Sequence, residues 1–130
     1  MQKIKEIPYI TLHVTLVAGN LNPNYFGKIL FDDLPLQIAT TNSPNAEFLC
    51  LTTERMLNNG ETINKFFTQS YLSDEVLSRI YLNSSWIHRE VWKSYPKLLP
   101  NQSFPPIEID DNFFYVNSFE PFISVSFNFK

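Results

Sequence analysis

Hydrophobic and polar residues alternate one by one over residues 9–18. The apolar positions are Ile10, Leu12, Val14 and Leu16, and the intervening positions are Thr11, His13 and Thr15. A period of two is typical of a half-buried β-strand, because successive side chains point to opposite sides of the backbone. The pattern predicts a strand here and a turn over residues 20–24, which follow a glycine and contain a proline.

Further short segments have the composition of strands and are separated by turn residues. They cover residues 25–31, 36–41, 47–53, 63–68, 86–95 and 113–116. The sequence Asn58-Asn59-Gly60 indicates a turn, and a hairpin is one interpretation of it, before the segment that begins at Ile63. The first half of the chain is therefore predicted to be mostly antiparallel β-structure.

Two helices complete the predicted fold. Ser73 is a suitable N-cap, because Asp74 and Glu75 place negative charge in the first turn of a helix over residues 73–82. A second helix is predicted to open near Phe119, with Pro121 in its first turn. These elements predict the α+β class, an antiparallel sheet with one or two short helices, in one domain over residues 1–130.

Composition supports folding and excludes several partners. Of the 130 residues, 44% are hydrophobic and 15% aromatic, which is enough to build a single core. The net charge is −3 without a basic cluster, so we expect no nucleic-acid partner. No apolar run is long enough for a transmembrane segment or for the central part of a signal peptide. Cys50 is the only cysteine, and we interpret it as a small buried residue in a strand.

The remaining candidate groups receive structural interpretations. His13 and His88 lack further ligands at metal-binding spacing, so no metal site is predicted. Asp32-Asp33 and Asp110-Asp111 are interpreted as solvated loop caps. In a strand, Trp86 and Trp92 would share one face with His88; core packing is the favoured interpretation, and a wall of a ligand site is the alternative. Asn83 and Asn101 begin Asn-X-Ser sequons and are glycosylation candidates.

Four blocks of sequence resemble one enzyme family. They are Thr15 to Gly27, Ile38-Ala39-Thr40-Thr41, the region from Ser70 to Leu82 leading to Trp86, and Phe104-Pro105-Pro106-Ile107 through Phe113 to Glu120. In this order they resemble the lyase domain of prenylcysteine oxidases, also called prenylcysteine lyases. The first and last blocks are the specific ones. The resemblance covers about residues 8–123, and the tail over residues 124–130 departs from the family pattern.

The resemblance implies a chemistry. Enzymes of this family use FAD to oxidise the thioether of farnesyl- or geranylgeranyl-cysteine, giving a prenyl aldehyde, free cysteine and hydrogen peroxide during turnover of prenylated proteins. The family implies a lysosomal or endomembrane setting, and a fold like that of the flavin amine oxidases, in which the substrate domain is built on an antiparallel sheet. The glycine-rich dinucleotide fingerprint of the family is absent here, so we expect the substrate-side portion of such an enzyme, as a fragment or shortened product.

Candidate site residues follow from the same resemblance. Asn117, Ser118 and Glu120 are expected nearest the flavin, because the corresponding family segment runs from a strand towards the cofactor. Tyr25, Phe26 and Trp86 are expected to contact the prenyl group. No catalytic acid or base is assigned, because the family's hydride acceptor is the flavin itself. The alternative hypothesis is a non-catalytic prenyl-binding or relic domain without the flavin-binding half.

Overall fold

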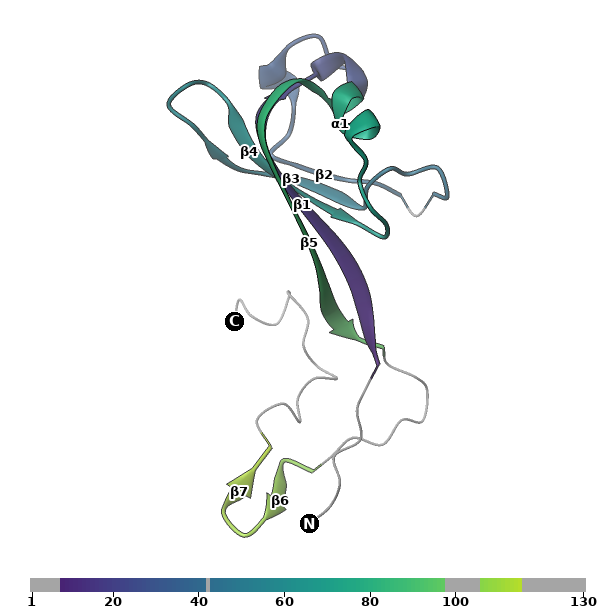
Figure 1. The fold of residues 1–130 in the computed structure, drawn as a ribbon, viewed down its shortest axis with the longest axis vertical. Helices are drawn as coiled ribbons and strands as arrows, with labels where there is room; N and C mark the ends of the chain where they lie inside the picture. The colour runs from purple at the N-terminus through teal and green to yellow at the C-terminus, as the bar shows by residue number, and fades with distance from the viewer. Residues whose placement is uncertain (1–7, 42, 98–105, 116–130) are drawn as a thin grey trace. The chain divides into compact units, whose positions relative to one another are not determined.

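A computed structural model describes residues 8–41, 43–97 and 106–115. Contacts divide the chain into two compact units, one formed by residues 12–92 and the other by residues 1–11 and 93–130. The larger unit carries most of the secondary structure, and Figure 1 shows its strands and its α-helix.

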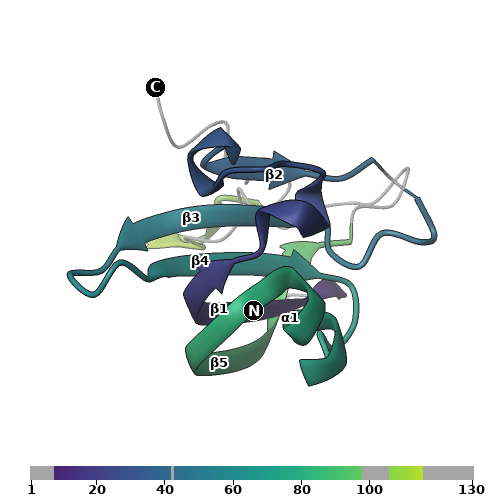
Figure 2. The ribbon, with the colours of Figure 1, turned by 90° about the horizontal axis from the view of Figure 1, so that it is seen from above.

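Five strands form one sheet in the order β2-β3-β4-β1-β5. Their bounds are β1 Tyr9–Leu21, β2 Gln37–Ala39, β3 Cys50–Met56, β4 Thr62–Thr68 and β5 Tyr81–Pro96. The pairs β1–β4, β2–β3 and β3–β4 are antiparallel. Figure 2 shows β3, β4 and β1 side by side. The strands predicted at residues 9–18, 63–68 and 86–95 are confirmed, and those predicted at 36–41 and 47–53 are confirmed in shortened or shifted form.

A tight hairpin joins β3 to β4. Gly60 has φ 85° and donates its backbone N–H to the Leu57 carbonyl at 3.0 Å. The Asn59 side chain accepts from the Glu61 backbone N–H at 3.1 Å. A left-handed glycine and an asparagine that bonds its own turn are the features expected of this sequence, so the predicted hairpin is confirmed.

The α-helix α1 spans Asp74–Ile80. Ser73 caps it, because its hydroxyl oxygen accepts from the Val76 backbone N–H at 3.3 Å, as the sequence predicted. The helix buries Leu77 and Ile80 in the core. At Tyr81 the chain enters β5 without a turn, so β5 begins five residues before the predicted start.

The core joins the sheet, α1 and the adjoining loops. Its buried members are Val17, Leu21, Phe48, Leu51, Phe66, Leu72, Leu77, Ile80 and Tyr81. Phe66 is fully buried and makes edge-to-face contacts with Phe48 and Tyr81. Gly19 is needed where β5 passes close to β1, since a Cβ there would lie 2.3 Å from the Asn83 carbonyl oxygen. No other residue fits without moving the backbone of β5.

The strand predicted at residues 25–31 is wrong. The chain there forms two 3-10 helices, η1 at Pro23–Phe26 and η2 at Phe31–Asp33. The Asn22 side chain caps η1 by accepting from the Asn24 backbone N–H, Pro23 occupies the first turn, and Gly27 ends it with φ 68°. These local signals of a helical turn outweigh the β-propensity of Tyr25 and Phe26.

The smaller unit contains one described hairpin, formed by β6 (Glu108–Asp110) and β7 (Phe113–Phe114). Asn112 adopts φ 56° in its turn, a conformation that asparagine tolerates better than most residues. The predicted strand at residues 113–116 is thus confirmed for its first two residues, and residue 116 and the helix predicted near Phe119 lie outside the described residues. An antiparallel sheet with few short helices agrees with the predicted α+β class. The likeness to a flavin amine oxidase substrate domain stays a prediction, as does the single domain.

Candidate functional site

The strand register gives the sheet of the larger unit two different faces. On one side, called the inner face, Thr15 pairs with Phe66 and Val17 pairs with Asn64, and all four side chains are buried. This is the side on which Leu77 and Ile80 of α1 join the core. On the other side, called the outer face, the same register places Leu12, Val14 and Leu16 of β1 together with Ile63, Lys65 and Phe67 of β4.

Side-chain contacts assign the two sides of β5 to these faces. Ile87 packs against the buried core. Arg89 donates to the Leu72 carbonyl at 3.1 Å and pairs with Asp74 at the start of α1, so it also lies on the inner side. Because side chains alternate along a strand, the even positions Trp86, His88, Glu90 and Trp92 point to the outer face.

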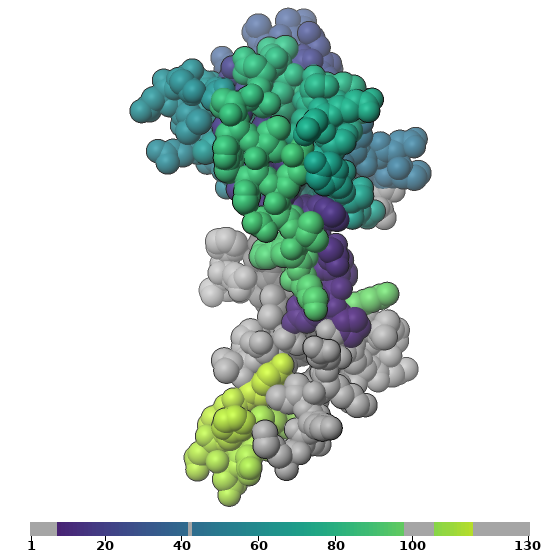
Figure 3. Space-filling model, viewed as in Figure 1, coloured from purple at the N-terminus to yellow at the C-terminus, as the bar shows by residue number. Residues whose placement is uncertain are grey.

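The outer face is apolar but only partly covered. Leu12, Val14, Leu16, Ile63 and Phe67 are all half-buried. Trp86 is 48% exposed and Trp92 54% exposed, and Figure 3 shows β5 at the molecular surface. The interpretation of the two tryptophans as core residues is therefore wrong, because α1 covers the opposite side of their strand. The prediction that Trp86 and His88 share a face is confirmed, since their rings stack at 5.7 Å with an angle of 5°.

On β3 and β4, two charged groups lie beside the apolar residues of the outer face, and Glu90 points to the same face from β5. The Lys65 ammonium pairs with the Glu54 carboxylate at 2.5 Å and lies 5.5 Å from the centre of the Phe67 ring. Lys65 is the direct cross-strand neighbour of Leu16. Sequence reasoning missed these residues, although residues 62–68 alternate, because a period of two does not say which side stays uncovered.

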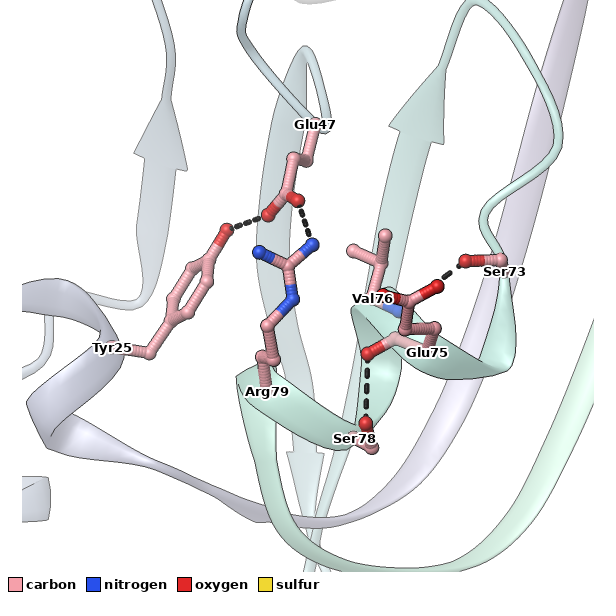
Figure 4. A network of polar contacts seen from close by, with 7 residues as sticks. All are labelled: Tyr25, Glu47, Ser73, Glu75, Val76, Ser78 and Arg79. Atoms are coloured by element: carbon pink, nitrogen blue, oxygen red, sulfur yellow. Dashed lines mark hydrogen bonds and ion pairs between the residues drawn. The ribbon is translucent and has the colours of Figure 1, made fainter.

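The hydroxyl of Tyr25 belongs to a polar network, and its predicted contact with a prenyl group stays a prediction. Its hydroxyl donates to the Glu47 carboxylate, which also pairs with Arg79 of α1 (Figure 4). Burial, followed by the hydrogen bond to Glu47, raises the pKa of Tyr25 to about 12. The neutral phenol is therefore the form present at neutral pH, and it ties η1 to the loop before β3 and to α1.

The three predicted prenyl contacts do not form one cluster. Phe26 packs against Tyr25 at 4.9 Å and both rings lie against the core cluster. Within the part of the chain that the structure describes, no ring contact joins either of them to Trp86, which stacks on His88. Trp86 alone belongs to the outer face.

One hollow of the larger unit is polar. It has a volume of about 400 Å3 and lies at the loops that flank β3 and β4. Its lining residues are Thr41, Ser43, Pro44, Ala46, Glu47, Phe48, Leu49, Gln69 and Ser70. Glu47 is the charged group in this lining, and it is already paired with Arg79 and Tyr25. The hollow is therefore a poor match for a hydrocarbon ligand.

The structure describes only some of the remaining predicted residues. Asn83 is exposed, and its side-chain oxygen accepts from the Asn20 amide at 3.1 Å. Asn101, Asn117, Ser118 and Glu120 lie outside the described residues. Cys50 lies in a strand as expected, but it is half-buried rather than buried.

One aspartate of each acidic pair bonds a nearby backbone N–H, and His88 Nε2 lies 3.0 Å from a carboxylate oxygen of Glu90. Asp33 and Asp110 accept backbone N–H groups of Leu30 and Asp111, which agrees with their interpretation as loop caps. Among residues 8–41, 43–97 and 106–115, no group of three or more His, Cys, Asp or Glu side chains could hold a metal ion. In the same residues no helix has the length and hydrophobicity needed to cross a membrane.

The described residues do not fit a dinucleotide cofactor. Pyrophosphate groups are usually bound by a glycine-rich loop at a helix N-terminus, where backbone N–H groups and the helix dipole face the anion. Here α1 has seven residues, begins with Asp74 and Glu75, and uses Ser73 to satisfy a backbone donor. Two carboxylates at this position would repel a phosphate. A flavin would need groups other than those described.

Comparisons with known proteins agree on one family. The family model described as prenylcysteine lyase matches residues 1–126. Farnesylcysteine lyase of Arabidopsis thaliana is 34% identical over 109 residues, which cover 83% of this chain and 22% of that protein. Prenylcysteine oxidase 1 of Rattus norvegicus is 28% identical over 123 residues, covering 87% of this chain and 24% of that protein.

The chain thus spans about a quarter of the length of the curated relatives it matches. The matched region includes the whole five-stranded sheet and α1. A match over nearly the whole chain, together with a relative above 30% identity, confirms the resemblance seen in the sequence: the chain belongs to the prenylcysteine lyase family.

Proposed function

We propose that this chain is the substrate-side part of a flavin-dependent thioether oxidase that cleaves S-prenyl-L-cysteine. The overall reaction would consume one oxygen and one water, break the bond between sulfur and the first prenyl carbon, and release a prenyl aldehyde, cysteine and hydrogen peroxide. Family membership supports the substrate class, and the names of the relatives specify farnesylcysteine and prenylcysteine for those proteins.

The outer face is the structural observation that carries the proposal. A prenyl group is a long hydrocarbon, and sites for such ligands are lined mainly by aliphatic and aromatic side chains. The outer face offers both kinds, with half-buried Leu and Val side chains on β1 and the exposed Trp86 on β5. Covering these side chains with hydrocarbon would remove apolar surface from water, which is favourable by about 25 cal/mol per Å2.

The role proposed for this chain is binding and shielding. FAD, when bound by the complete enzyme, would supply the oxidation. Because the described residues do not fit a dinucleotide, they are assigned no part in holding it. Their own contribution would be to hold the prenyl chain, orient the thioether and keep water away from it. Asn117, Ser118 and Glu120 stay predicted flavin neighbours.

A non-catalytic prenyl-binding domain is the second candidate. The observation that favours it is the same pair of facts, an apolar sheet face and no dinucleotide site among the described residues. This candidate predicts saturable binding of farnesylcysteine without its conversion. It differs from the first candidate in its products, because it releases no aldehyde, cysteine or hydrogen peroxide.

Release of farnesal from S-farnesyl-L-cysteine tests the proposal. The protein would be produced in eukaryotic cells from the intact gene and incubated with the substrate and oxygen. Farnesal and hydrogen peroxide should then form in equimolar amounts. Flavin-loaded protein that leaves the substrate intact would contradict the oxidase assignment. Saturable binding by protein that produces no aldehyde would support the second candidate.

We also propose a lysosomal or endomembrane location, with a glycan on Asn83. Its side chain is exposed in a sequon whose third residue is Ser85. Treatment with an endoglycosidase should increase the mobility of the protein from secretory cells. Asn83→Gln should remove most of that change, whereas identical mobility of treated and untreated protein would contradict the assignment.

A further inference from the structure

The outer face combines an apolar strip with an ion pair beside it. Leu12, Val14 and Leu16 follow one another on the same side of β1. Phe67 is the cross-strand neighbour of Val14, and Trp86 and Trp92 point to the same side from β5. No described helix covers this side, so it differs from the inner face both in chemistry and in exposure.

The length of the strip suits a single hydrocarbon chain. Four residues of β-strand separate Leu12 from Leu16, which corresponds to about 13 Å at the usual rise. An extended fifteen-carbon isoprenoid has a length of this order. A second copy of the protein would instead need a much larger surface, since stable interfaces bury about 800 Å2 per partner.

The ion pair beside the strip matches an amino-acid head group. Lys65 is the cross-strand neighbour of Leu16 and is paired with Glu54, and Ala18 and Ile63 continue the outer face beyond it. Their side chains are 31% and 39% exposed, so both charges can be approached from solvent. Free S-prenyl-cysteine carries an ammonium and a carboxylate next to its hydrocarbon tail. An ion pair beside an apolar strip is complementary to such a zwitterion, because each charge can meet its opposite.

We infer that S-prenyl-cysteine lies along β1 on the outer face, with its amino-acid head at Lys65 and Glu54 and its prenyl tail running from Leu16 towards Leu12. This inference rests on the proposed substrate class and adds a site and an orientation to it. The tail lies between Phe67 on one side and Trp86 on the other. The head would be recognised by charge, and the tail would be held by burial against apolar side chains, with the His88–Glu90 pair of β5 on the same face.

Tryptophan fluorescence measures this binding without catalysis. Trp86 and Trp92 are the two tryptophans of the chain, and both point to the outer face. Titration of the full chain with S-farnesyl-L-cysteine should give a saturable shift of the emission to shorter wavelength as hydrocarbon replaces water around the indoles. Farnesal formation is not needed for this readout, so a failure of binding is distinguished from a failure of the proposed oxidation.

Two variants separate the head from the tail. Lys65→Gln should weaken binding of S-farnesyl-L-cysteine about fivefold, as expected for the loss of one partly exposed charge pair. It should leave binding of farnesyl methyl thioether, which lacks the amino-acid head, unchanged. Lys28→Gln is the matched control, because Lys28 is exposed in the bend after η1 and should affect neither ligand.

The tail is tested on β5. Trp86→Ala, followed through Trp92, should weaken both ligands about tenfold, as expected for a large aromatic contact. Val91→Ala is the control, since Val91 is 58% exposed on the opposite side of the same strand. Equal effects of Lys65→Gln on both ligands, equal effects of the two β5 variants, or a fluorescence change that follows dimer formation in sedimentation would each overturn the inference.

Discussion

The inner and outer faces of one sheet differ in polarity and in exposure to solvent. The inner face is closed and contains polar groups, among them Asn64, which is fully buried and bonded to Thr53, Thr62 and Tyr81. The outer face has more apolar side chains, yet they stay half-exposed. Hydrophobicity alone therefore did not decide which side of the sheet became the core. A closed polar face stabilises the fold, whereas an open apolar face is available for binding.

Adjacent phenylalanines on β4 give the sharpest test of this comparison. Phe66 is fully buried on the inner face, and Phe67 is half-buried on the outer face. Phe66→Ala should lower the free energy of unfolding by about 3–5 kcal/mol, because it leaves a cavity in the core. Phe67→Ala should cost about 1 kcal/mol, since less area is lost. Urea unfolding followed by circular dichroism would measure both, and equal losses would contradict the assignment of the faces.

The buried polar network should respond next most strongly. Asn64→Ala removes the acceptor of the Tyr81 and Thr62 hydroxyls and the donor to Thr53. Leaving buried groups unsatisfied should lower the free energy of unfolding by about 3 kcal/mol. Tyr81→Phe removes one donor only and should cost about 1 kcal/mol. Equal free energies of unfolding for the two variants, measured by urea unfolding, would contradict the assignment of three hydrogen bonds to the Asn64 side chain.

Alkaline pH should lower the stability of the fold through Tyr25 and Tyr81. Tyr25 has its pKa raised to about 12 in the folded state, against 10.0 for an ordinary tyrosine, and burial raises the pKa of Tyr81 above its usual range as well. Above pH 10 the unfolded chain loses these protons while the folded chain retains them. Stability should therefore be fully present below pH 10 and fall as the pH rises towards 12.

Substitution of Tyr25 identifies its share of this pH dependence. Tyr25→Phe should cost about 1 kcal/mol at neutral pH, because it removes the hydrogen bond to Glu47. It should also reduce the slope of stability against pH between 10 and 12. Urea unfolding at several pH values, with absorbance of the ionised phenols recorded in parallel, measures both effects. An unchanged slope would mean that Tyr25 is not protected in the folded state.

The smallest effects on stability are expected at the exposed positions of β5. Trp86→Ala and Val91→Ala should each change the free energy of unfolding by no more than about 0.5 kcal/mol, because about half of each side chain already faces water and neither belongs to the buried core. Thermal unfolding should show nearly equal midpoints for the two variants. A large loss for Trp86→Ala would indicate that the outer face contributes to the core.

Local patterns allowed a good part of the fold to be predicted. The cap at Ser73 and the acidic first turn placed α1, and the turn residues Asn59 and Gly60 placed the hairpin. The segment after Pro23 was misassigned, because the aromatic residues Tyr25 and Phe26 favour strands while the Asn22 cap and Gly27 favour a helical turn. The start of β5 was also missed, since no turn residue separates it from α1.

The outer face could not be assembled from the sequence, because it depends on contacts between distant segments. Trp86 and Tyr25 stay predicted prenyl contacts; the structure places Trp86 on the outer face and bonds the Tyr25 hydroxyl to Glu47, a residue 22 positions away. The position of Lys65 and Glu54 beside the apolar residues of β1 follows only from the pairing of β3 with β4 and of β4 with β1.

The sequence by itself determined the family, the strand periods, the turns and the helix cap, because each of these is written in neighbouring residues. It also determined that one side of β1 is more apolar than the other. Only the tertiary structure decided that the polar side with Thr15 is the buried one. The reason is physical: α1 and Tyr81 return to that side, supply Leu77 and Ile80 for burial and give Asn64 its hydrogen-bond partner, so the apolar row from Leu12 to Leu16 is left facing outward.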